Sequence, residues 1–104
     1  MFIKGMLKEE LQNSLRARRD YERAIARLPK GALVKKIIRG RPYYYLAVRE
    51  GKRVRFAYKG KLSEQDIRPY EEAKEYRGRY RKQISELNRQ VRFLRRILRG
   101  PESV

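Results

Sequence analysis

The sequence predicts an α+β fold in which a helix, a three-stranded antiparallel β-meander and a long second helix follow one another. Apolar residues recur at alternating spacings of four and three in the first and last thirds of the chain, which is the period of an amphipathic helix. In the middle third they form short alternating runs separated by Gly-containing dipeptides at hairpin spacing. We expect the two helices to pair as an antiparallel, coiled-coil-like hairpin.

With 104 residues, the chain has room for a single domain over residues 1–104. No apolar run approaches the roughly 20 residues of a membrane-spanning helix. Residues 1–6 are too short and too quickly charged to be expected to act as a secretory signal, and the absence of cysteine excludes disulfides and thiolate metal sites. We therefore expect a cytoplasmic protein.

The first helix is predicted over residues 6–28. It has no interior Gly or Pro, and Pro29 and Gly31 end it. The seam of its apolar face is imperfect because two of its positions are polar. The positions on this face are Leu7, Leu11, Ser14, Arg18, Tyr21, Ile25 and Leu28.

A three-stranded sheet is predicted over residues 32–61. Its strands are runs rich in β-branched and aromatic residues, and Arg39-Gly40 and Glu50-Gly51 are the predicted turns. If Glu50-Gly51 is a two-residue turn, Tyr45 lies opposite Phe56. The face that contains this pair and Tyr58 is mainly apolar and suited to packing against the helices, and the opposite face, which contains Tyr44, Arg53 and Arg55, is predicted to be the basic one.

The second helix is predicted over residues 69–99, beginning at Pro69, a favourable first helical residue, after a capped turn at 63–68. Its four-three repeat continues for about four heptads and stops at Gly100-Pro101. If Pro69 lies level with Leu28, the first helix ends near position 91.

The end of the second helix would then lack a partner from the first helix. Either Phe2, Ile3 and Met6 fold over this end, or a second protomer covers it, and we favour self-association. The residues predicted to mediate it are Val91, Phe93, Leu94, Ile97 and Leu98.

Charge gives the strongest functional indication. The chain has 29 Lys or Arg against 12 acidic residues, for a net charge of +17, and its many arginines match phosphate geometry. A heat-adapted surface of salt bridges would instead be balanced in charge. Self-repulsion on this scale favours a counter-charged partner.

Catalysis is not expected. The sequence has no His or Cys and two Asp, and it contains no phosphate-binding loop, nucleophile motif or metal-ligand spacing. We expect a non-enzymatic protein without a cofactor or metal.

The predicted sheet carries most of the excess charge. Residues 29–62 contain eleven Lys or Arg and one acid, Glu50, for a net charge of +10. Basic sheets with interleaved aromatics suit base stacking and phosphate contact. The predicted nucleic-acid-binding residues of this region are Lys35, Lys36, Arg41, Tyr44, Arg53, Arg55, Lys59 and Lys61.

A second basic cluster lies at the end of the second helix. Cations suit a helix C-terminus, but their density here exceeds that need. We expect an auxiliary patch that contacts the phosphate backbone through Arg92, Arg95, Arg96 and Arg99.

Several short motifs run through the middle of the chain: Leu28-Pro29-Lys30-Gly31, Tyr43-Tyr44-Tyr45-Leu46, Arg49-Glu50-Gly51-Lys52 and Tyr58-Lys59-Gly60. The chain resembles an uncharacterised prokaryotic family of small helix–meander–helix proteins with an L-P-K-G step, a Y-Y-Y-L-x-x-R-E-G-K-V hairpin and a Y-x-G exit. Arg53 interrupts the family's K-V here. The resemblance implies the architecture and transfers no activity.

The sequence therefore favours nucleic-acid binding, with DNA and RNA both open. The main alternative is an adaptor or antitoxin-like subunit whose helices bind an acidic protein. Binding to an anionic membrane fits less well, because neither helix is a Lys-bordered amphipath with bulky lipid-facing aromatics.

Overall fold

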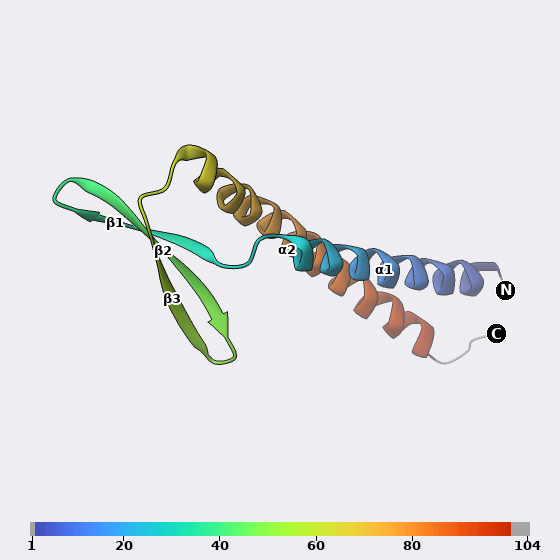
Figure 1. Ribbon diagram of the computed structural model, residues 1–104. Coiled ribbons are helices and arrows are strands. Elements are labelled where there is room, and N and C mark those ends of the chain that lie inside the picture. The colour runs from blue at the N-terminus through green and yellow to red at the C-terminus, as the bar shows by residue number, and fades with distance from the viewer. Residues whose placement is uncertain (1, 101–104) are drawn as a thin grey trace. The chain divides into compact units, whose positions relative to one another are not determined.

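The computed structural model describes residues 2–100 and has the predicted α+β order (Figure 1). The chain divides into two compact units. The helix unit contains α1 and the part of α2 from Gly78 onward, and the sheet unit is Leu28–Arg77. The elements are α1 (Phe2–Arg27), β1 (Ala32–Ile38), β2 (Arg41–Glu50), β3 (Arg53–Gly60) and α2 (Glu64–Arg99).

The helix unit is an antiparallel pair, as predicted. Gln90, late in α2, contacts Glu10, early in α1, and the rings of Tyr21 and Tyr80 lie 5.6 Å apart between centroids. Val91 of α2 is the most deeply buried side chain of the described residues, with 1% exposed. Burial of the apolar seam is the main source of helix stability in such a pair.

Two polar side chains interrupt this seam, and both have partners. The buried Ser14 accepts a hydrogen bond from Gln90 Nε2 at 3.0 Å, and Arg18 Nη1 donates to Asn88 Oδ1 at 2.9 Å. Buried polar groups are costly when unpaired, so a slip of one helix past the other would be penalised. The imperfect seam thus fixes the register of the pair.

The prediction that Val91 and Leu94 lack a partner within the chain is wrong. Their side chains are only 1% and 4% exposed. The hydrogen bond between Ser14 and Gln90 brings these two positions together, and α1 continues from there back to Phe2. The predicted alignment of Leu28 with Pro69 had placed the end of α1 too early.

The end of the helix pair still exposes apolar side chains. Ile3 and Met6 are mostly exposed and do not form the predicted cover, and the side chain of Phe2 lies outside the described part of the structure. On α2, Phe93 is 56% and Ile97 43% exposed. Self-association through Phe93, Ile97 and the partly exposed Leu98 stays a prediction.

Helix α2 begins at Glu64, five residues before the predicted start at Pro69. The cause is a capping box: Ser63 Oγ accepts from the Asp66 N–H, and Asp66 Oδ2 accepts from the Ser63 N–H, both at 3.2 Å. Pro69 lies inside the helix, where it has no N–H for the carbonyl of Gln65. The expected capped turn is therefore the first turn of α2.

The sheet has the order β1-β2-β3 and is antiparallel throughout. Arg39 and Gly40 both have positive φ, 52° and 76°, as a type I′ turn requires, which confirms the first predicted turn. The second turn is Gly51-Lys52, not Glu50-Gly51, because Glu50 pairs with Arg53. Gly51 takes the first central position with φ 62°, which suits a type II′ turn.

This second turn shifts the β2–β3 register by two residues from the prediction. Tyr45 lies opposite Tyr58, and Ala47 lies opposite Phe56. A shift of two preserves the face of every side chain, whereas a shift of one would invert it. Lys59 is an extra residue between the pairs Tyr44–Gly60 and Tyr45–Tyr58, so it forms a β-bulge.

The sheet unit has no buried side chain on either face of its sheet. Strand β1 pairs with the first part of β2 and β3 with the last part, so all three strands run together only around Tyr44–Ala47, and the two hairpins diverge beyond it (Figure 1). None of residues 32–60 is buried. The face expected to pack is open, since Phe56 and Tyr58 are each 59% exposed.

Two glycines make a matched test of the structure. A methyl group on Gly78, inside α2, meets nothing within 4 Å, so Gly78→Ala should stabilise the protein by about 1 kcal/mol through helix propensity. Gly31 has φ 94°, and a methyl group there would lie 2.9 Å from the Ala47 carbonyl oxygen. Gly31→Ala should therefore destabilise by roughly 1 kcal/mol or more. Urea unfolding followed by circular dichroism measures both, and changes of the same sign would contradict the assignment.

Candidate nucleic-acid interface

The pairing of the strands defines two faces of the sheet, because side chains alternate along a strand and directly paired residues share a face. The Tyr44 face consists of Leu33, Lys35, Ile37, Pro42, Tyr44, Leu46, Val48, Glu50, Arg53, Arg55 and Ala57. The Phe56 face consists of Ala32, Val34, Lys36, Ile38, Arg41, Tyr43, Tyr45, Ala47, Arg49, Val54, Phe56 and Tyr58.

The predicted binding residues of the sheet do not share one face. Four of them lie on the Tyr44 face: Lys35, Tyr44, Arg53 and Arg55. Lys36 and Arg41 lie on the Phe56 face, because adjacent residues of a strand point to opposite sides. Of the remaining two, Lys59 is the bulge residue and Lys61 follows β3.

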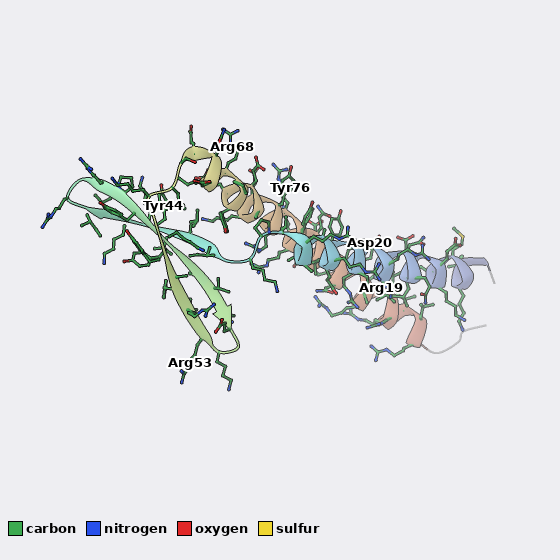
Figure 2. The ribbon with its side chains drawn as sticks, viewed as in Figure 1. Arg19, Asp20, Tyr44, Arg53, Arg68 and Tyr76 are labelled. Carbon is green, nitrogen blue, oxygen red and sulfur yellow. The ribbon has the colours of Figure 1, made fainter. Side chains whose placement is uncertain are left out.

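All eleven cations of residues 29–62 are exposed. The only acid in this segment, Glu50, is engaged by Arg55, whose Nη2 lies 3.2 Å from the carboxylate. The other ten cations form no ion pair with any described residue. Figure 2 shows Arg53 extending from the tip of the β2–β3 hairpin and Tyr44 near the middle of the sheet.

The positive charge is therefore distributed over both faces and both turns of the sheet. The Phe56 face carries Lys36, Arg41 and Arg49 with no acid, whereas Glu50 offsets part of the charge of the Tyr44 face. A polyanion could meet cations from either side. The prediction of a single basic face is corrected to a sheet that is basic on both.

The aromatic residues are the part of the site that sequence reasoning missed. Phe56 and Tyr58 were assigned to packing, but both rings are open to solvent. The ring of Tyr58 lies against Tyr45, with 5.2 Å between centroids and 59° between planes. A signal was present in the sequence, because Arg41 and Arg49 share this face, and a core-facing side rarely carries two arginines.

The four arginines predicted at the end of α2 are brought together. They line a recess of about 510 Å³ in the helix unit, beside Leu11 of α1 and Leu98 of α2. All four are exposed, and none forms an ion pair or hydrogen bond within residues 2–100: Arg92, Arg95, Arg96 and Arg99. Guanidinium groups suit bidentate contact with phosphate oxygens.

Between residues 2 and 100, acidic side chains form no group of three that could hold a metal ion. Neither α1 nor α2 has an apolar stretch of the length and hydropathy needed to cross a bilayer.

One protein-family model matches the chain, over residues 9–69, and its description is "Domain of unknown function (DUF6788)". The match covers more than half of the 104 residues. The chain belongs to the DUF6788 family. No curated protein and no solved structure matches it.

This membership agrees with the predicted resemblance to an uncharacterised family, although the match does not test the L-P-K-G and Y-Y-Y-L pattern itself. The DUF6788 segment includes the whole sheet and the eleven exposed cations of residues 29–62. The arginine recess, at residues 92–99, lies beyond the matched segment.

The pairing of Glu50 with Arg55 gives a test. Glu50→Gln removes the only carboxylate of the sheet region and frees Arg55, so the protein should elute from a heparin column at higher salt. Glu9→Gln changes the net charge equally at an exposed position of α1 that has no ion pair with a described residue. Equal shifts for the two variants would show that only total charge matters.

Proposed function

We propose that this protein is a non-enzymatic nucleic-acid-binding protein whose sheet contacts the phosphate backbone. The observation that carries the proposal is the set of eleven exposed cations in residues 29–62, of which a single one has a carboxylate partner. A polynucleotide supplies closely spaced negative charges, and neutralising them releases condensed counterions. This release favours binding without any particular base sequence.

The heat-adapted alternative is less consistent with this sheet. Networks of surface ion pairs stabilise proteins at high temperature, but they require acidic partners. In the sheet unit a single ion pair is present among the strand residues, between Glu50 and Arg55. The uncompensated cations repel one another and disfavour the folded sheet. A polyanionic partner would reduce this repulsion, whereas in a network of ion pairs the acidic residues would already have neutralised the cations.

The arginine recess is a second candidate contact. Its four guanidinium groups share one side of α2, and two leucines form its apolar part. Arginine combines a planar charge with weak hydration, which suits phosphate recognition. In this proposal the sheet supplies the principal contact, and the recess adds backbone contacts that carry no sequence information.

An acidic protein is the second candidate partner. The exposure of Phe93 and Ile97 at the end of α2, 56% and 43%, favours it, since exposed apolar side chains beside a charged rim are typical of protein interfaces. The absorbance ratio at 260 and 280 nm of the purified protein separates the two candidates. Co-purified nucleic acid raises this ratio, and an acidic protein does not.

Salt dependence tests the electrostatic mechanism. If about six cations meet phosphates, the logarithm of affinity should fall against the logarithm of salt concentration with a slope of about −4 for a single strand and −5 for a duplex. Fluorescence anisotropy with a labelled oligonucleotide at several salt concentrations gives this slope. A slope near zero would refute phosphate neutralisation.

Charge reversal tests the location. Arg53→Glu combined with Arg55→Glu should reduce affinity at least tenfold, because two attractive charges become repulsive. Arg16→Glu combined with Arg19→Glu makes the same change of net charge on exposed positions of α1 and should have a much smaller effect. The same anisotropy assay compares the two double variants. Similar losses would exclude the sheet as the principal contact.

A further inference from the structure

We propose that the Phe56 face is a stacking platform for unpaired bases, so that the preferred ligand is a single-stranded polynucleotide. This inference rests on the proposed function and names its substrate class. It starts from the aromatic side of the sheet, which was expected to pack and is open instead.

The geometry of β3 presents two rings in line. Phe56 and Tyr58 are separated by one residue and point to the same face, so their Cα atoms lie about 6.8 Å apart along the strand. Each side chain is 59% exposed. Consecutive bases of an extended strand can each find a ring at this spacing, as in sheet proteins that stack two or three bases on strand aromatics.

The neighbours of these rings leave their surfaces available. Phe56 lies opposite Ala47, whose methyl side chain is too small to cover a phenyl ring. Tyr58 lies opposite Tyr45, and the two rings meet at 59° between planes. Such a tilted contact involves an edge and stabilises the pair, so Tyr45 supports Tyr58 from one side.

The cations of the same face decide between possible occupants. Lys36, Arg41 and Arg49 lie on the Phe56 face, which has no acid. A second copy of this face would bring like charges together, and an uncharged apolar partner would bury these cations at high cost. A polynucleotide with exposed bases offers both phosphates for the cations and flat apolar surfaces for the rings.

The preference for single strands follows from the accessibility of the flat surfaces of the bases. In a duplex the bases stack on one another, so exposed rings on a sheet gain contact only after unstacking. In a single strand the base surfaces are accessible, and stacking on an aromatic side chain is tolerant of sequence. The Phe56 face therefore favours single strands, of DNA or RNA, over duplexes.

Binding of matched oligonucleotides tests this preference. We expect oligo-dT or oligo-U to bind at least tenfold more tightly than a DNA duplex of equal length at the same salt concentration. Phe56→Ala should weaken single-strand binding about tenfold and leave duplex binding unchanged. Gln83→Ala is the control, because Gln83 is an exposed residue of the helix unit that belongs to none of the proposed contacts; it should leave both unchanged. Comparison of the dT and U arms separates DNA from RNA.

A fluorescent reporter tests stacking directly. The sequence contains no Trp, so Phe56→Trp introduces a single indole that can be excited selectively and keeps an aromatic surface. Stacked bases should quench its emission on titration with oligo-dT or oligo-U, and binding should stay within about threefold of the unmodified protein. The indole of Gln83→Trp, at an exposed position of the helix unit outside the proposed contacts, should keep its emission.

The outcomes separate the inference from the function on which it rests. Quenching confined to Phe56→Trp, with single strands bound in preference, supports the platform. Binding of duplexes as tight as that of single strands, or an unaffected Phe56→Ala variant, overturns the platform and leaves nucleic-acid binding standing. Absence of binding to any oligonucleotide at low salt overturns both.

Discussion

The repulsion between uncompensated cations in the sheet unit is the constraint on which the rest of the structure depends. Residues 29–62 hold a net charge of +10, and none of the strand residues is buried. A sheet without a core has only its hydrogen-bond ladder, its turns and its cross-strand pairs to oppose that repulsion. Exposure of every cation to water keeps the charges screened, and the divergence of the two hairpins beyond Tyr44–Ala47 separates the cations at their tips.

The helix unit, unlike the sheet, has a buried apolar seam. Its charges lie on the outside, and its seam is closed by apolar residues such as Val91 and Leu94 together with one polar layer at Ser14 and Gln90. The polar layer specifies which residues of α1 and α2 meet. The helix unit thus supplies a buried apolar seam together with the arginine recess. The sheet unit supplies exposed cations and exposed aromatic rings on the same strands. A site for a polyanion needs exposed charged groups, and the strands of the sheet unit present them.

The sequence predicted which segment carries the candidate site more reliably than it predicted which side chains share a face of the sheet. Eleven cations with one acid are visible in the sequence, and their exposure follows from the cost of burying a charge. The grouping of these cations on the two faces of the sheet was not visible in the sequence. Lys35 and Lys36 were predicted in one set of binding residues, and the strand pairing puts them on opposite faces. Phe56 was assigned to a packing face because the residues around it alternate as in a half-buried strand. For the arginine recess, the sequence predicted the cluster of arginines correctly. The structure adds Leu11 of α1, which lines the recess beside them.

The sequence by itself determined the element order, the type I′ turn at Arg39-Gly40 and the antiparallel helix pair, because these depend on local propensity and on periodicity within a short window. Only the tertiary structure decided the helix register, the position of the second turn and which faces are covered. The register depends on which polar partners meet across the seam, as Ser14 and Gln90 do, and such partners lie far apart in the sequence. Whether an apolar face is buried depends on the presence of a second surface to cover it, and alternation along a strand carries no information about that surface.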